Sequence, residues 1–316
     1  MRTRYPEAPD PRLLSYFVSG SSVDAGLLRY DLGIEVEEYP TAIKVLKRYG
    51  CKFEQTGADS YRLQHSGLGV WQDYLEYIIR SETTLDASVR VYQETSSTQD
   101  QAKRLAPKRA IVIANQQTAG RGRLGRSWVS NSGESVLMSI CLPSESSALT
   151  HDRASMLAGV AVARAVEVLL PGITVRLKWP NDIMINGKKL AGILIEAVHG
   201  ASIIGIGLNV QKISNTTPEI NNIATCLAEH RSFPDRLYVI EKIIIELDKA
   251  LRLSSENLML DEWRSRAALG QTQTFEQAGQ RITGEVLDLD PDHGLIVRRD
   301  TGEIVTLPAA TTSVVK

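Results

Sequence analysis

Apolar residues near the N-terminus recur at intervals of three and four, which is the spacing of helices that bury one face. This spacing predicts helices near 13–18, 24–32 and 40–49, and a glycine that can end a helix follows each of the last two. Two segments of alternating apolar and polar residues, 51–54 and 61–64, flank a turn-forming sequence and predict a hairpin. Three helices followed by a two-stranded hairpin are typical of a winged helix-turn-helix unit.

From about 85 to 265 the pattern changes to short apolar strands that alternate with amphipathic helices. The predicted strands are 89–94, 110–114, 135–142, 175–179, 183–185, 190–198 and 202–210. The predicted helices are one that begins at a capping box of Thr98 and Gln101, and those over 153–170, 236–253 and 256–268. Asn186-Gly187 is a strong two-residue hairpin signal, so the sheet is expected to be mixed rather than purely parallel.

Short strands separated by Asp-His-Gly and Asp-Thr-Gly turns fill the last part of the chain and predict a small β-barrel module. A connecting helix near 70–80 joins the N-terminal unit to the alternating region. The patterns together predict an α+β multidomain chain, divided into domains over 1–80, 81–268 and 269–316.

Composition narrows the class of protein. The chain has 316 residues and a net charge of −1, which argues against bulk electrostatic attraction to nucleic acid or membrane. The three cysteines are widely spaced and form no CxxC pair, which fits a cytoplasmic protein without a disulfide framework. The sequence has no apolar run of membrane-spanning length, and its polar N-terminus is not that of a signal peptide. HExxH and GxSxG motifs are absent from the sequence.

The segment GRGRLGRSW, residues 120–128, combines three glycines with three arginines. It fits the dinucleotide pattern GxGxxG, nearly fits a Walker A loop, and is similar in composition to RNA-binding Arg-Gly segments. Both nucleotide motifs need a helix directly after the loop, but 129–133 is rich in turn formers. We therefore interpret the segment as one ordered loop that closes on an anion through its guanidinium groups. The alternative is a solvated basic turn.

Four more polar segments lie at the ends of predicted strands. Each alone has a structural explanation: a helix cap at 96–99, a surface turn at 178–182, an edge lysine before 190–196, and a strand-ending turn at 205–209. Their recurrence at strand ends favours a common ligand site instead, because ligands of α/β sheets gather there.

These segments carry a family resemblance. The motifs SST, Q-x-x-GRGRxGRxW, KWPND, KLAGILIE and GIGLNV follow one another as in the bifunctional biotin protein ligase and biotin operon repressor family, which the chain resembles over nearly its whole length. The resemblance implies a winged helix-turn-helix domain, a catalytic domain similar to class II aminoacyl-tRNA synthetases, and an SH3-like C-terminal barrel. It also implies activation of biotin with ATP and Mg²⁺ to biotinyl-5′-AMP, and transfer to a lysine of the biotin carboxyl carrier protein of acetyl-CoA carboxylase. Lipoate ligation on the same fold is the alternative reaction.

The resemblance also assigns roles to residues of this chain. The implied biotin-binding residues are Ser97, Thr98, Gln99, Gln117, Arg121, Gly122, Arg123, Lys189 and Gly192. The implied nucleotide-binding residues are Arg123, Arg126, Trp128, Lys178, Asn181 and Asn209, with Asp182 as a ligand of Mg²⁺. Arg123, Lys189 and Lys178 are the implied catalytic residues. Fixed cations would relieve the repulsion between the biotin carboxylate and the ATP α-phosphate, so no nucleophilic side chain is needed.

The family further implies a homodimer and operator binding by the N-terminal unit, through Thr41, Lys44, Lys47 and Arg48. Pro40 has no N–H to donate, so this helix is expected to begin near Tyr39. Residues 21–50 contain four basic and five acidic side chains, the opposite of the usual balance in DNA-binding modules. Substrate gating, or a vestigial unit, is therefore the alternative to operator binding.

Overall fold

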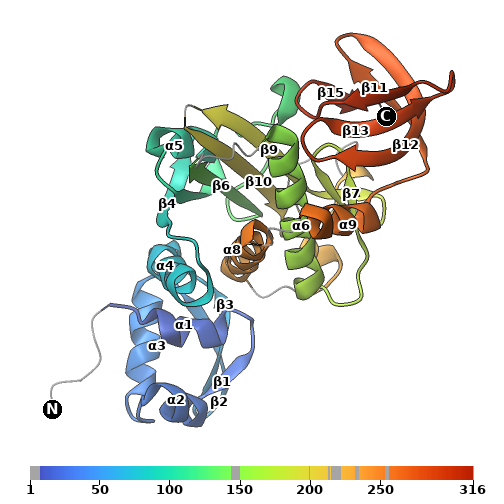
Figure 1. Ribbon diagram of the computed structural model, residues 1–316. Coiled ribbons are helices and arrows are strands. Elements are labelled where there is room, and N and C mark those ends of the chain that lie inside the picture. The colour runs from blue at the N-terminus through green and yellow to red at the C-terminus, as the bar shows by residue number, and fades with distance from the viewer. Residues whose placement is uncertain are drawn as a thin grey trace.

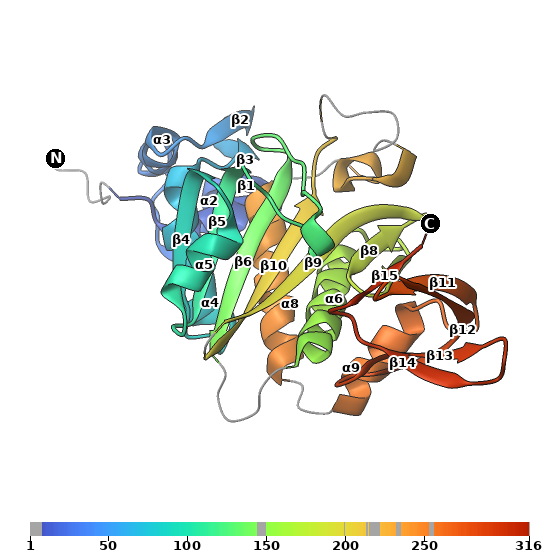
Figure 2. The same cartoon turned by 90° about the horizontal axis from the view of Figure 1, so that it is seen from above.

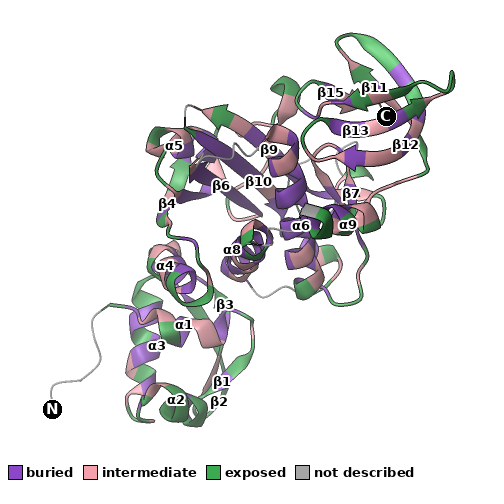
Figure 3. Cartoon of the chain, in the orientation of Figure 1, coloured by how far each residue is buried: buried purple, intermediate pink, exposed green. Residues whose placement is uncertain are grey.

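The computed structural model describes residues 8–143, 150–198, 200–212, 214, 222–231, 235–252 and 256–315. An N-terminal unit, a central sheet with its helices, and a C-terminal sheet follow one another along the molecule (Figure 1). Buried residues are concentrated in the central sheet and the helices packed on it (Figure 3). No helix in these ranges is long and apolar enough to cross a membrane.

The N-terminal unit joins short helices to a small antiparallel sheet. Its elements are α1 (Pro11–Phe17), β1 (Ser22–Asp24), α2 (Ala25–Leu32), α3 (Tyr39–Arg48), β2 (Lys52–Gly57), β3 (Ser60–His65), η1 (Leu68–Val70) and α4 (Trp71–Glu82). Gly33 ends α2 with a φ of 66°, and α3 begins at Tyr39 with Pro40 in its first turn, as predicted. The sequence pattern missed β1, which is too short to show a period; it pairs with β3, so the strand order is β1-β3-β2.

Buried hydrogen bonds fix the N-terminal unit to helix α8 (Arg236–Arg252) of the central unit and to Asp235, the residue before it. The Ser66 hydroxyl lies 2.5 Å from Asp235 Oδ1 and accepts a bond from Trp71 Nε1 at 2.8 Å. The Tyr74 hydroxyl donates to Glu241 Oε2 at 2.5 Å. The two units therefore share a packed interface in addition to the chain that connects them.

The central sheet is mixed, which confirms the prediction. Its strands are β4 (Ser88–Thr95), β5 (Ala110–Gln117), β6 (Ser135–Pro143), β7 (Val175–Lys178), β8 (Asp182–Ile185), β9 (Lys188–Val198) and β10 (Ala201–Asn209). Their order is β4-β5-β6-β10-β9-β8-β7; β4 and β5 run parallel, and all other neighbours are antiparallel. Asn186 and Gly187 both have positive φ, 49° and 76°, as a two-residue hairpin turn between β8 and β9 requires.

Helices cover both faces of this sheet (Figure 2). Ile111 and Ile113 of β5 face the large core that includes α6 (His151–Leu169) and α8, whereas Ala110 and Val112 face a smaller core that includes Ala102 of α5 (Thr98–Leu105). The alternation of side chains along a strand explains this division. On the α5 face, no helix of the described residues covers part of β6, β9 and β10 (Figure 2).

The predicted capping box at the start of α5 is wrong by one residue. Ser97 is the N-cap, and its hydroxyl accepts a bond from the Gln99 N–H at 3.3 Å. Gln101 instead donates to the Thr95 hydroxyl. The Thr98 side chain is engaged elsewhere, with Gln117 and Ser139, because it lies at the edge of the candidate site.

The C-terminal unit follows α9 (Glu256–Arg266), which ends two residues earlier than predicted. Its strands are β11 (Thr272–Gln277), β12 (Gln280–Asp290), β13 (Gly294–Arg299), β14 (Ile304–Leu307) and β15 (Thr312–Val314), in the order β14-β13-β12-β11-β15. Within the described residues β14 and β15 are the sheet edges and do not pair, so a closed barrel is not found. Trp179 packs edge-on against Phe275, with ring centroids 5.9 Å apart, and joins this unit to the central one.

Candidate active site

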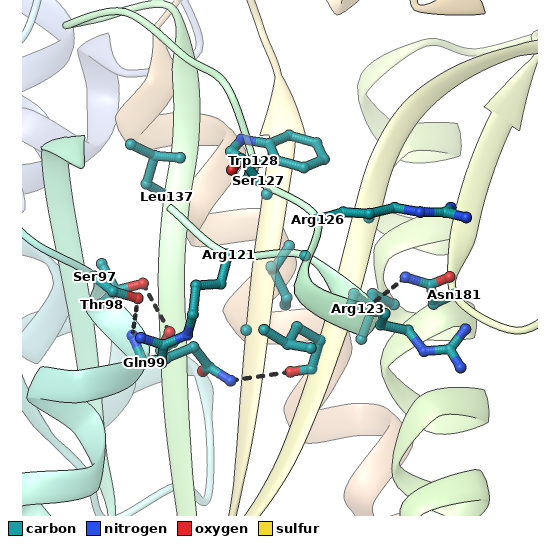
Figure 4. A pocket seen from close by; sticks show the side chains of 18 of the residues that line it. Ser97, Thr98, Gln99, Arg121, Arg123, Arg126, Ser127, Trp128, Leu137 and Asn181 are labelled. Carbon is teal, nitrogen blue, oxygen red and sulfur yellow. Dashed lines mark hydrogen bonds between the residues drawn. The ribbon is translucent and has the colours of Figure 1, made fainter. Parts of the chain in front are cut away.

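A pocket lies on the α5 face of the central sheet, under the glycine-arginine loop (Figure 4). Its lining includes Ser97, Thr98, Gln99, Gln117, Arg121, Gly122, Arg123, Arg126, Trp128, Asn181, Asp182, Lys189 and Gly192. The structure thus brings together residues from five separate segments of the sequence. The cavity volume is only about 150 Å³, less than the roughly 300 Å³ of a small ligand site, because loop side chains fill part of it.

Hydroxyl and amide groups line one end of the pocket. The Thr98 hydroxyl and N–H both donate to Gln117 Oε1, at 3.0 and 2.7 Å, and the same hydroxyl lies 2.8 Å from that of Ser139. Gln99 Nε2 donates to Glu196 Oε2 at 2.9 Å, while its buried Oε1 has no partner in the described part of the chain. Ser139 was missed by the sequence reasoning, although a polar residue inside the apolar strand β6 is a usable signal.

Arg121 spans the wall of the pocket toward this end. Its guanidinium forms two 2.8 Å bonds to Asp100 and a longer one, 3.4 Å, to Glu196. The bond from Arg121 holds the pKa of the Asp100 carboxyl below its ordinary value. Asp100 and Glu196 were not assigned from the sequence, because a carboxylate partner of a loop arginine has no fixed spacing from it.

The loop makes hydrogen bonds of its own. The Gly122 N–H donates to the Arg126 carbonyl at 2.7 Å, and the Trp128 N–H donates to the Gly120 carbonyl at 3.0 Å. A short 3-10 turn, η2 (Arg123–Gly125), forms its tip, and Leu124 there has a φ of 53°. The segment therefore forms a loop with hydrogen bonds of its own, and 129–134 form no helix after it, as expected from their turn-forming residues.

Trp128 rests on a flat patch made by two glycines. Gly192 of β9 and Gly207 of β10 face each other in the strand register. A Cβ at Gly207 would meet Trp128 Cε2 at 2.5 Å, so the indole in this position requires glycine there; one at Gly192 would meet Trp128 Cζ3 at 3.1 Å, a tight contact. Lys189 Nζ lies 5.6 Å from the indole centroid, within cation–π range.

The cation end of the pocket is formed by the KWPND and KLAGILIE segments and the loop tip. Lys189 Nζ lies 2.5 Å from Asp182 Oδ1, and Asn181 Nδ2 donates to the Ile193 carbonyl at 2.8 Å. Arg123 points toward the C-terminal unit; its Nη2 donates to the carbonyls of Ala309 and, at 2.9 Å, Thr312. Burial lowers the pKa of the Arg123 guanidinium.

Two predicted nucleotide ligands do not line this pocket. Lys178 lines a small neighbouring cavity that also touches Asn181 and Asp182, and it borders the groove between β7 and the C-terminal unit. Asn209 is buried, and its Nδ2 donates to the Thr225 carbonyl at 3.1 Å. The described residues contain no cluster of three or more His, Cys, Asp or Glu side chains suited to a metal ion.

The candidate DNA-binding residues lie far from the pocket, on α3. Lys44, Lys47 and Arg48 are exposed, Thr41 is half-buried, and the apolar residues between them face the core. Lys47 Nζ lies 5.8 Å from the Tyr61 ring centroid. The helix thus presents a basic side to its surroundings.

Comparison with known proteins places the chain in a family. A profile of the biotin/lipoate A/B protein ligase family matches residues 89–212. The bifunctional ligase/repressor BirA of Bacillus subtilis is 34% identical over 306 residues, which cover 90% of each chain. A biotin–[acetyl-CoA-carboxylase] ligase of Mycobacterium tuberculosis is 31% identical over 207 residues, 63% of this chain and 76% of that protein.

Solved structures agree with this placement. A biotin protein ligase from Aquifex aeolicus, in complex with biotin and ATP, superposes with a TM-score of 0.64 and 28% identity, over 72% of this chain and 98% of that one. The chain belongs to the biotin/lipoate A/B protein ligase family, and within that family it is a biotin protein ligase.

Proposed function

We propose that the chain activates biotin with ATP and passes the biotinyl group to a carrier lysine. In the first step a biotin carboxylate oxygen bonds to the α-phosphorus of ATP, giving biotinyl-5′-AMP as pyrophosphate leaves. In the second, the amine of a lysine attacks the acyl carbon and AMP leaves. The observation that carries this proposal is a single pocket with hydroxyl and amide groups at one end and cationic side chains at the other.

The carrier is proposed to be the biotin carboxyl carrier protein of acetyl-CoA carboxylase. A relative of similar sequence is named a biotin–[acetyl-CoA-carboxylase] ligase, which supports this substrate.

The hydroxyl and amide end suits the ureido ring of biotin, which is neutral and both donates and accepts hydrogen bonds. Thr98, Gln117 and Ser139 are already connected there by hydrogen bonds, so their positions are set before the ligand arrives. Ser97 belongs to the same set and is buried beside them. The unpartnered Oε1 of Gln99 is proposed to accept a bond from the ligand.

The cationic end suits the reacting oxygens. Arg123, Lys189 and Arg126 would stabilise the charge that develops as the carboxylate meets the α-phosphate. Arg121 and Gly122 would close over the biotin, and Gly192, which lines the same pocket, would lie beside it. Closure of the loop would exclude water from the mixed anhydride.

Trp128 and Asn181 line the same pocket and are proposed to bind the nucleotide. Lys178 would reach the nucleotide from the small cavity that it shares with Asn181. Asn209 is included because its buried Oδ1 lacks a partner in the described residues. Mg²⁺ enters as part of MgATP, held mainly by phosphate oxygens, and Asp182 offers it one carboxylate.

Biotin-dependent exchange of label between pyrophosphate and ATP tests the first step. Wild-type protein should catalyse this exchange, and Arg123→Ala and Lys189→Ala should each slow it by about a hundredfold. Arg104→Ala, a change on the exposed side of α5, is the matched control and should exchange normally. Normal exchange in both pocket variants would show that these residues take no part in the mechanism. Absence of exchange in the wild type would contradict the proposed function. Calorimetric titration with biotin and with lipoate shows which of the two acids the protein binds.

A second role is proposed for the N-terminal unit: repression of transcription by operator binding, in a homodimer that carries biotinyl-AMP. The full-length match to a bifunctional ligase/repressor and the exposed basic side of α3 support it. A mobility shift of operator DNA, with and without biotin plus ATP, tests the repressor role. Absence of retardation at low salt would contradict it.

We also propose that the N-terminal unit is a winged helix-turn-helix domain and that the C-terminal unit is of the SH3-like class. The proposed domain boundaries lie after residues 80 and 268, and the proposed location of the protein is the cytoplasm.

A further inference from the structure

Arg123 is held by a segment that lies 186 positions later in the sequence. The C-terminal segment from Ala309 to Thr312 leads from β14 into the first residue of β15, and two of its carbonyl oxygens accept hydrogen bonds from Arg123 Nη2. Carbonyl oxygens are neutral acceptors, so they orient a guanidinium without neutralising its charge. The place of this cation in the pocket therefore depends on where the C-terminal segment is fixed.

A buried carboxylate fixes that segment. Asp152 lies in the first turn of α6 and is 7% exposed. Its Oδ1 accepts a bond from the Ala309 N–H at 2.8 Å, so Ala309 is held through its N–H by Asp152 and holds Arg123 through its carbonyl. This chain of contacts connects α6, the C-terminal segment and the loop.

A charged carboxylate at this buried position costs free energy unless neighbouring groups stabilise it. Burial raises the pKa of Asp152, and the nearby carboxylates of Asp290 and Asp292 act in the same direction. The Ala309 N–H and the charge of Arg123 act against this effect. An asparagine could also accept from the Ala309 N–H, so the hydrogen bond alone does not require an acid. The negative charge beside a half-buried arginine is what distinguishes aspartate here.

We propose that Asp152 is a positioning residue for Arg123, which acts by fixing Ala309 and by adding, beside the carboxylate of Asp182, a buried negative charge that attracts the guanidinium. The inference rests on the proposed role of Arg123 in biotin activation. Asp152 itself lines no part of the pocket, so it is expected to influence the reaction only through the arginine.

A double-mutant cycle on the full chain tests this dependence, with biotin-dependent pyrophosphate exchange as the readout. Asp152→Asn keeps an acceptor for the Ala309 N–H but removes the negative charge that attracts the Arg123 guanidinium. It should slow exchange between about tenfold and a hundredfold in the wild-type background, because a small displacement of a reacting group is costly. In the Arg123→Ala background the same change should alter exchange by less than about twofold, because residues that act as a unit are not additive. Asp152→Glu, which keeps the charge, should recover part of the lost rate.

The matched control is Asp292→Asn, which removes a carboxylate near the same end of α6; that carboxylate pairs with Arg153 rather than with Ala309. Its exchange rate should stay within about twofold of wild type. Equal slowing by Asp152→Asn in both backgrounds would overturn the inference, since the residue would then act independently of Arg123. Absence of exchange in the wild type would instead overturn the proposed function.

Limited trypsin cleavage adds a readout that does not need activity. Arg123 is half-buried against the C-terminal segment, so cleavage after it should be slow in the wild type and faster in Asp152→Asn. Cleavage after the exposed Arg126 should not change. Unchanged cleavage at both positions in a folded Asp152→Asn protein would also contradict the proposal, and so would equal acceleration at both, which indicates general loosening.

Discussion

Glycine at position 207 sets the depth of the pocket, because the Trp128 indole occupies the space where a side chain would begin. We expect Gly207→Ala to push the indole and the attached loop away from β9 and β10. The affinity for biotin should then fall at least tenfold, since a misplaced loop cannot close. Calorimetric titration with biotin measures this change.

The control for that substitution is Gly159→Ala, in the interior of α6. A Cβ there would meet Leu177 Cδ2 at 3.7 Å, an ordinary contact. Alanine is the better helix former, so this variant should gain up to about 1 kcal/mol in the free energy of unfolding. If both variants bind biotin like the wild type, the indole does not shape the site.

The Asp100–Arg121 pair predicts a pH dependence of stability. The pKa of Asp100 is below its ordinary 3.8 in the folded protein, so the folded state binds fewer protons than the unfolded one. Its stabilising contribution is therefore present above about pH 4 and is lost as pH falls through the lowered pKa. Asp100→Asn should be less stable than wild type to urea at neutral pH, with a difference that shrinks below about pH 4.

Asp86→Asn is the charge-matched control, because Asp86 is exposed and its carboxylate makes no ion pair in the described structure. Its stability relative to wild type should not vary with pH in this way. A difference for Asp100→Asn that is the same at both pH values would show that the effect does not come from the ion pair.

At the scale of elements, helices α4 and α8 determine how the N-terminal unit meets the central sheet. The Tyr74 hydroxyl donates to the buried carboxylate of Glu241. Tyr74→Phe removes this donor, and we expect it to lower the free energy of unfolding by about 1.5–3 kcal/mol, the usual range for a hydrogen bond to a charged group. Urea unfolding measures the change. Tyr30→Phe, at a side chain that is 90% exposed, should be neutral; equal effects would contradict the role of the interface.

On the scale of the whole molecule, a protein of net charge −1 can bind DNA only through a local concentration of positive charge. The exposed side of α3 offers Lys44, Lys47 and Arg48. We expect Lys44→Glu to abolish retardation of operator DNA, while biotin-dependent exchange remains as in the wild type. A mobility-shift assay beside the exchange assay separates the two functions.

Arg281→Glu introduces the same change of charge on the exposed surface of the C-terminal unit, far along the chain from α3. It should leave retardation unchanged. Equal loss in both variants would mean that overall charge, and not α3, governs the interaction with DNA.

Local patterns were enough to predict many elements of this fold. Asn186-Gly187 predicted the β8–β9 hairpin, because few residue pairs tolerate positive φ at both positions. Pro40 predicted the start of α3, because a helix tolerates proline only in its first turn, where the missing N–H would have no intrahelical partner. The polar segments at strand ends predicted much of the site, since strands of one sheet end close together. The sequence did not distinguish the N-cap of α5, because Ser97 and Thr98 are both residues that favour this position. In the structure Ser97 is the N-cap, and the Thr98 hydroxyl instead donates to Gln117 in the pocket.

By itself, then, the sequence determined most of the strands and helices, the mixed sheet, the arginine loop and the class of ligand, because each depends on short-range spacing and side-chain chemistry. Only the tertiary structure decided that Lys178 faces a neighbouring cavity, that Ser139 joins Thr98, and that Asp152 meets the segment holding Arg123. Such contacts join residues tens to hundreds of positions apart. Their geometry follows from strand order and the packing of whole units, which no local pattern encodes.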